Sequence, residues 1–206
     1  MEGIIAIVIG LGLLVAIIVW AVKYTKKINK RKERFYSEFA QKHGLQHSSS
    51  KYMMAMLNVV QGTYKGSPFT VFEKMEGSGK NKSVVTRASF ENVPFDYDFK
   101  IGKEHIFSKA GKLLGMKDIE FGDEEFDKKF LIKSKDEEKF RAFFNYKLQG
   151  ALKELKSDLA SSIRVSDGTM TYMHYGPLPN EKTFRSFERV VDFMILLIDE
   201  ASHSRS

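Results

Sequence analysis

The chain begins with an unbroken apolar stretch and then changes to alternating and amphipathic patterns. Residues 3–22 contain no charged side chain over twenty positions. At about 1.5 Å per helical residue the stretch is about 30 Å long, which matches the hydrocarbon thickness of a bilayer. A helix in the core of a soluble domain would show a polar face, and this stretch has none. Trp20 and Tyr24 lie where interfacial aromatic residues are expected. The pattern predicts a transmembrane anchor over residues 1–22.

The helix is expected to continue beyond the membrane. Apolar residues recur at helical intervals as far as Phe39. Gly44, followed by an apolar residue, predicts a Schellman-type helix end. We therefore predict a basic juxtamembrane helix over residues 23–44, a soluble domain over residues 45–200, and a disordered tail over residues 201–206.

The first part of the soluble domain predicts antiparallel strands. Residues 46–50 are interpreted as a polar linker, and residues 52–57 as one or two helical turns. β-branched and aromatic residues between turn residues then predict strands, at residues 59–65, 68–74, 83–90, 97–101 and 130–133. Gly66-Ser67 predicts a two-residue hairpin loop. A short helix is expected over residues 107–114.

Two long amphipathic helices are predicted in the second part of the domain. The S-x-x-E box at 134–137 predicts the start of the first helix, whose apolar stripe runs from Phe140 to Leu159. The second is predicted over residues 184–198. The order of elements predicts an α+β domain with a mainly antiparallel sheet and both helices on one sheet face.

A hairpin is predicted between these helices. Asp167-Gly168 is typical of a type I′ turn. This turn predicts that Val165 lies opposite Met170 and that Ile163 lies opposite Tyr172.

The positive charge is concentrated directly after the apolar stretch. Because residues 23–34 carry +6 and Glu2 carries −1, residues 35–206 carry only +2 of the total of +7. By the positive-inside rule the N-terminus is expected outside and the domain in the cytoplasm.

The same basic cluster is the candidate contact with anionic lipid headgroups, at about 1 kcal/mol for each Lys or Arg near the surface. The residues assigned to this contact are Lys23, Lys26, Lys27, Lys30, Arg31 and Lys32. A second interpretation stays open, in which the charges only set topology and extend to the interface. No aromatic residues interleave with the cluster as a base-stacking platform would require, so nucleic acid is not the expected partner.

Two further questions concern the apolar stretch. A cleaved signal peptide is the competing interpretation, but the stretch lacks a positive segment before it and a basic cluster follows at once. The small-residue spacings Ala6-x3-Gly10 and Gly12-x3-Ala16 would allow two such helices to approach closely, which would form a homo-oligomer.

Motifs for catalysis or metal binding are not found. The absence of Cys excludes a disulfide scaffold, a Cys-ligated metal site and a Cys nucleophile. GSGK at 77–80 lacks two required positions of a phosphate-binding loop. His43 and His47 have a zinc-like spacing, but a glycine separates them. The acidic run at 118–127 does not match a calcium loop. We therefore assign no catalytic, cofactor or metal residue.

Several segments resemble a known group of proteins. They are IEFGDEEFDKKFL at 119–131, KSKDE at 133–137, IRVSDG at 163–168 and the closing amphipathic helix. With the N-terminal anchor, this layout resembles uncharacterised membrane-anchored bacterial proteins with a domain of unknown function, over about residues 35–200. The resemblance implies a single-pass protein of the bacterial inner membrane and implies no activity.

Three hypotheses of function follow. The first is a membrane-anchored, non-enzymatic binding or scaffold domain with an unknown protein or small-molecule ligand. The second is a subunit of a larger membrane complex. The third is a membrane-tethered, metal-dependent hydrolase or transferase, with a site assembled from the acidic run and His105 or His174.

Overall fold

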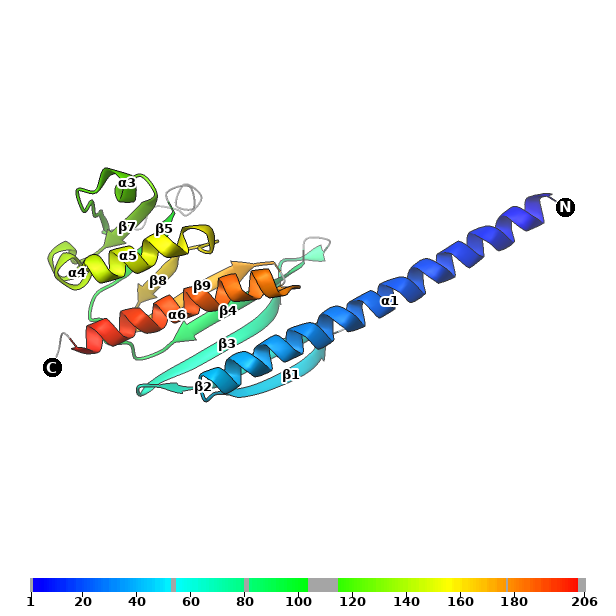
Figure 1. Cartoon of the computed structure of the whole chain (residues 1–206), viewed down its shortest axis with the longest axis horizontal. Helices are drawn as coiled ribbons and strands as arrows, with labels where there is room; N and C mark the ends of the chain where they lie inside the picture. Colours follow the sequence, from blue (N-terminus) through cyan, green and yellow to red (C-terminus); the bar gives the residue numbers. More distant parts are fainter. Residues whose placement is uncertain (1, 53–54, 80–81, 104–114, 177, 204–206) are drawn as a thin grey trace.

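The computed structural model describes residues 2–52, 55–79, 82–103, 115–176 and 178–203 (Figure 1). The helices are α1 (Glu2–Lys42), α3 (Glu124–Asp127), α4 (Glu137–Phe143), α5 (Tyr146–Glu154), the 3-10 helix η2 (Leu155–Ser157) and α6 (Glu181–His203). The strands are β1 (Gln46–Tyr52), β2 (Ala55–Tyr64), β3 (Ser67–Glu76), β4 (Ser83–Phe90), β5 (Phe99–Lys103), β6 (Lys117–Asp118), β7 (Phe130–Ser134), β8 (Ile163–Ser166) and β9 (Thr169–Tyr175).

The strands form one sheet in the order β1-β2-β3-β4-β9-β8-β5-β7-β6, and every neighbouring pair is antiparallel. The second half of α1 lies beside α6 over the sheet, and α5 follows on the other side of α6 (Figure 1). This arrangement confirms the predicted α+β class with a mainly antiparallel sheet.

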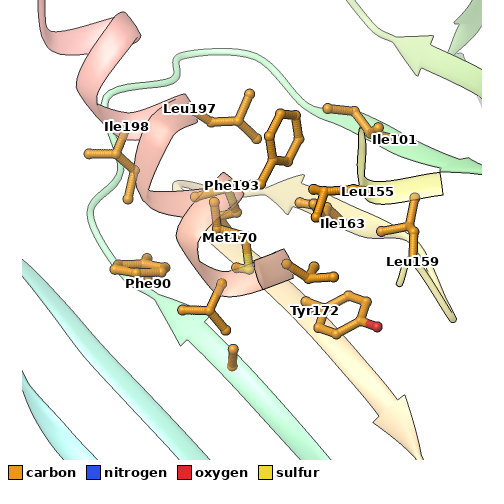
Figure 2. Packing of buried hydrophobic residues seen from close by; sticks show 14 of the residues in the cluster. Phe90, Ile101, Leu155, Leu159, Ile163, Met170, Tyr172, Phe193, Leu197 and Ile198 are labelled. Atoms are coloured by element: carbon orange, nitrogen blue, oxygen red, sulfur yellow. The ribbon is translucent and has the colours of Figure 1, made fainter. Parts of the chain in front are cut away.

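The core lies between these helices and the sheet face that they cover. Alternate strand residues on that face are buried, because successive side chains of a strand point to opposite faces. Figure 2 shows Phe193, Leu197 and Ile198 of α6 together with Ile163 and Met170 of the β8–β9 hairpin. All five side chains are at most 3% exposed.

Helix α1 is continuous from the apolar stretch into the domain and ends where predicted. Gly44 adopts a positive φ of 65°, and the Leu45 N–H donates to the Ala40 carbonyl at 2.8 Å. This six-to-one bond is the Schellman ending, which confirms the prediction made from Gly44.

The domain includes part of the segment that the sequence assigned to a separate juxtamembrane helix, residues 23–44. Phe35, Tyr36 and Phe39 of α1 are at most 2% exposed. The ring of Phe184 in α6 lies 5.2 Å from the rings of both Phe35 and Tyr36, measured between centroids. The core therefore begins within α1 rather than after it.

The predicted linker at 46–50 and the predicted helical turns at 52–57 are wrong. Residues 46–52 form the edge strand β1, and residues 55–57 begin β2. The reason is that β1 pairs through its backbone with β2. Its side chains are mostly polar, so the apolar alternation that identifies a strand is absent.

The first predicted amphipathic helix, expected to begin at the 134–137 box and to continue to Leu159, is interrupted. Helix α4 ends at Phe143, and Asn145 caps the new helix α5 by accepting a hydrogen bond from the Leu148 N–H at 3.1 Å. Asp136, not Ser134, is the N-cap of α4. The apolar stripe continues across the break because both helices bury side chains in the same core.

The β8–β9 hairpin has the predicted register, with Val165 opposite Met170 and Ile163 opposite Tyr172. Asp167 and Gly168 have φ of 50° and 70°, as a type I′ turn requires. The β2–β3 turn is one residue earlier than predicted, because Tyr64 pairs with Ser67 and leaves Lys65-Gly66 as the loop.

Helix α6 extends beyond the predicted end at Ile198. It continues to His203, so the prediction of a disordered tail is wrong for residues 201–203. The predicted helix at 107–114 and the tail residues 204–206 lie outside the described residues.

Candidate functional site at the junction of α1 and the sheet

The first half of α1 is an exposed apolar helix. Its large apolar side chains from Ile7 to Trp20 are 46–65% exposed where they are described, and the half-helix projects away from the sheet (Figure 1). Leaving such a side chain in water rather than in an apolar medium costs about 1.5–3 kcal/mol. The helix is long and apolar enough to cross a membrane, although a signal sequence would pass the same test of length and composition.

An aromatic pair marks the end of this exposed half. The rings of Trp20 and Tyr24, one helical turn apart, are stacked with centroids 5.4 Å apart. Both side chains are more than half exposed. Their place at the end of the apolar stretch fits the headgroup level of a bilayer, where amphipathic rings are enriched.

The structure divides the six predicted headgroup contacts into two groups. Lys23, Lys26, Lys27 and Lys30 are exposed, and Arg31 is half-buried. We call these five residues the basic neck. They follow one another at helical intervals directly after the apolar half of α1.

Lys32 does not belong to the basic neck, and its assignment to a headgroup contact is wrong. Its side chain is 5% exposed, and its Nζ lies 2.8 Å from Oε1 of Glu73, whose side chain is fully buried. Lys32 also donates to the Met56 carbonyl at 3.1 Å. The reason is helical rotation, since two residues turn the side chain by about 200° relative to Lys30, from solvent toward the sheet.

Glu73 is the centre of a buried polar cluster beneath α1. Its Oε2 accepts hydrogen bonds from the backbone N–H and the side-chain amide of Asn58, at 3.0 and 2.8 Å. Asn58 is in turn 3.1 Å from the ring of His47, and Thr86 lies opposite Glu73 in the β3–β4 pairing. The carboxylate therefore has partners from α1 and from the sheet.

Tyr36 closes the cluster from the helix side, one turn after Lys32. Burial, reinforced by the negative charge of Glu73, raises the pKa of the Tyr36 hydroxyl well above its usual value. A buried ion pair contributes little net stability, but loss of one partner leaves an uncompensated charge. The cluster therefore fixes the rotation and depth at which α1 sits on the sheet.

A groove lies next to this cluster, on the side of the exposed apolar half of α1. It is lined by Val22, Thr25, Lys26, Asn29, Lys30 and Glu33 of α1, together with Lys51 of β1 and Met56 of β2. We call it the interfacial groove, and its volume is about 530 Å³. It brings cations of the basic neck together with Lys51, which lies outside the basic cluster of the sequence.

The acidic run has structural partners. Asp123 caps α3 by accepting from the N–H groups of Glu125 and Phe126 at 3.1 and 3.0 Å. Asp127 accepts from the N–H groups of Phe121 and Gly122, each at 2.9 Å. Two of the six carboxylates of the acidic run therefore accept hydrogen bonds from the backbone of their own loop.

The candidate histidines are dispersed. His43 lies beside Asp192, and burial lowers its pKa. His47 belongs to the Glu73 cluster, while burial lowers the pKa of His174 in β9. His105 lies outside the described residues. Within the described ranges, no group of three or more His, Asp or Glu side chains is placed to hold a metal ion.

The Glu73 cluster was not predicted from the sequence, although the pattern of β3 contains a signal for it. Phe69, Val71 and Glu73 alternate along β3 and are all buried on the helix-covered face. A charged residue at the third position of such an alternation indicates a buried ion pair, because an unpaired buried charge is costly.

Comparison of the chain with models of protein families, with curated proteins and with solved structures finds no match.

Proposed function

We propose that the chain is a single-pass protein of the bacterial inner membrane, whose cytoplasmic α+β domain is a non-enzymatic binding module. In this proposal, residues 1–22 cross the bilayer and the basic neck contacts the anionic cytoplasmic leaflet. The domain is then held at the membrane surface to bind a soluble or membrane partner.

The continuity of α1 is the observation that carries this proposal. A single helix without a break joins the exposed apolar half to the buried residues Phe35, Tyr36 and Phe39. Lys32 lies ten residues after Val22, which is about 15 Å along the axis. A bilayer around the apolar half would therefore place the first buried contacts of the domain close to the headgroups.

The orientation rests on the charge distribution. Lys and Arg follow the apolar half, whereas Glu2 precedes it. The positive-inside rule retains such a basic flank in the cytoplasm. Attraction to anionic lipid would add about 1 kcal/mol to the free energy of membrane binding for each exposed cation of the neck.

The test is a topology measurement on the full chain, which contains no Cys. Tyr146 is 90% exposed on the domain, so Tyr146→Cys reports the domain side, and Glu2→Cys reports the other side. In spheroplasts of expressing bacteria, a membrane-impermeant maleimide should label Glu2→Cys directly and Tyr146→Cys only after lysis. The reverse pattern would overturn the orientation, and loss of the N-terminal residues by mass spectrometry would indicate a cleaved signal peptide.

A second candidate function, a subunit of a larger membrane complex, is favoured by partly exposed apolar side chains on the sheet face opposite the helices. Val59, Phe72, Arg87 and Met173 form one cross-strand row on the face opposite the helices, and each is half-buried. Three of these four side chains are apolar. Apolar side chains that stay partly exposed next to one another are typical of protein contacts. In native membranes, Phe72→Ser should convert a large complex to the size of the free chain if this function holds, while an unchanged size would contradict it.

A further inference from the structure

We propose that the interfacial groove binds one anionic phospholipid, with the phosphate held by Lys26, Lys30 and Lys51 and an acyl chain passing Val22 into the bilayer. The proposal rests on the proposed function, because it requires α1 to span the membrane. It goes further by naming a defined site for a single lipid rather than a diffuse contact of the neck.

The position of the groove matches the boundary between acyl chains and headgroups. Its lining begins at Val22, the last residue of the apolar stretch, and extends to Glu33. Eleven residues correspond to about 16 Å of helix. The headgroup layer on one side of a bilayer is about 5–8 Å thick. The groove therefore opens at the hydrocarbon boundary and extends past the headgroups toward the domain.

The charges of the groove fit an anion. Lys26, Lys30 and Lys51 line it together with one acid, Glu33, so that its net charge is +2. None of the three lysines has a carboxylate within ion-pair distance in the described part of the chain, whereas Lys32 has Glu73. The lysines come from two elements, and their stems add apolar surface to that of Val22 and Met56.

The two walls of the groove are fixed to each other. Met56 of β2 donates its N–H to the Asn29 side chain at 3.4 Å and accepts from Lys32 at 3.1 Å. Both backbone polar groups of Met56 are thus bound by α1, and Lys32 is anchored by buried Glu73. Lys51 on β1 is held opposite the neck because it pairs with Met56 in the β1–β2 register.

A phospholipid suits this arrangement better than a soluble anion or a peptide. Its phosphate needs cations at the headgroup level, and its chains need an apolar exit toward the bilayer. The groove is lined by lysines, and its end nearest the apolar stretch is formed by Val22 at the membrane boundary. Lipid is also the one ligand class that is abundant at this depth.

The test is native mass spectrometry of the full chain, purified in mild detergent and titrated with phosphatidylglycerol or phosphatidylcholine. We expect one phosphatidylglycerol molecule to be retained in preference to phosphatidylcholine. Lys30→Gln/Lys51→Gln should weaken this first binding event about 30-fold, from about 1 kcal/mol for each lysine. Lys30→Arg/Lys51→Arg should retain it. Equal retention of the two lipids, or retention of phosphatidylglycerol by the Gln variant, would overturn the proposal.

Two controls separate the groove from general electrostatics and from misfolding. Lys117→Gln/Lys128→Gln removes the same charge near the β6 edge of the sheet, opposite the β1 edge, and should leave lipid binding and the circular dichroism spectrum unchanged. Lys23→Gln/Lys27→Gln alters the basic neck outside the groove. If this variant loses the first lipid as strongly as the groove variant, the defined site is overturned and diffuse attraction by the neck stands.

Failure of the groove and failure of the proposed function are distinguishable. The maleimide topology experiment reports membrane crossing independently of lipid binding. Normal topology without a preferred lipid would overturn only the groove. Displacement of the bound phosphatidylglycerol by inorganic phosphate at equal concentration would show that the site takes free phosphate rather than lipid, which would also overturn it.

Discussion

Lys30 and Lys32 are separated by one residue in α1, and the structure places them in opposite environments. Lys30 is exposed and lines the interfacial groove, whereas Lys32 is buried against Glu73. In the sequence both belong to one basic cluster. The comparison teaches that one run of basic residues can contain side chains of two kinds. Some are buried and fix the helix on its own domain, and others are exposed and can bind external partners.

The same distinction divides the whole chain. Many exposed lysines of the domain have a carboxylate within ion-pair distance, among them Lys65, Lys128, Lys135 and Lys147. The exposed lysines of the basic neck have no such partner among the described residues. The excess charge of the chain is therefore both concentrated and uncompensated at the neck, where a negatively charged surface would have the largest effect.

The largest expected effect distinguishes the two lysines directly. Lys32→Met leaves Glu73 as an unpaired buried charge and should lower the free energy of unfolding by about 3–5 kcal/mol. Lys30→Met, the matched control, should change it by less than about 0.5 kcal/mol. Both are measured by urea unfolding of the full chain in detergent. Equal effects of the two substitutions would contradict the view that Lys32 stabilises the fold and Lys30 does not.

Removing the buried charge as well should restore part of the loss. Lys32→Met/Glu73→Leu replaces the ion pair with apolar groups, and such replacements are often neutral or stabilising. The double variant should therefore be more stable than Lys32→Met alone. A double variant that is less stable would show that packing, rather than the unpaired charge, dominates at this position.

An intermediate effect is expected at a partly exposed ion pair. Asp158 accepts two hydrogen bonds from Arg189, both at 2.7 Å, and this contact holds the pKa of Asp158 below its usual value. Asp158→Asn should lower the free energy of unfolding by about 1–2 kcal/mol at pH 7. We expect a value near the lower end of this range, because Arg189 is half-exposed and solvent screens the pair. This stability is fully present above the unfolded-state pKa of about 3.9 and is lost as pH falls through the lower native pKa. Urea unfolding at pH 7 and pH 2.5 measures it, and a difference that persists at pH 2.5 would contradict the electrostatic cause.

The smallest effect is expected at a fully solvated pair. Glu124, the first residue of α3, and Lys128, which caps its C-terminal end, form an i,i+4 contact with side chains 83% and 71% exposed. Lys128→Gln should change the unfolding free energy by less than about 0.5 kcal/mol, because solvent screens such pairs. If the same urea experiment showed a decrease of more than about 1 kcal/mol in the free energy of unfolding, exposure would be a poor guide to how much a charged side chain stabilises this domain.

Local patterns were sufficient for elements whose signals lie within a few residues. The apolar stretch, the helix end at Gly44 and the hairpin at Asp167-Gly168 all depend on side-chain chemistry near the feature itself. The edge strand β1 could not be predicted in this way, because it is defined by backbone pairing with β2. The break at Asn145 was missed because the apolar stripe continues across it.

The candidate site was predictable only in part for the same reason. The basic neck follows from the linear charge pattern, and four of its lysines are exposed, while their contact with lipid headgroups stays a prediction. The burial of Lys32 depends on which face of α1 meets the sheet. The contribution of Lys51 depends on the β1–β2 hairpin folding back along the helix. Both are tertiary relationships that a linear pattern does not contain.

The unbroken course of α1 has a mechanical consequence. If the apolar half spans a bilayer, it is joined to the sheet by a rigid rod, since no loop or glycine hinge lies between Val22 and Lys42. This part of the rod is about 30 Å long, so a tilt of about 20° in the membrane displaces its far end sideways by about 10 Å. A helix tilts more in a thinner bilayer. The thickness of the surrounding membrane would thus set the angle at which the sheet faces the cell interior.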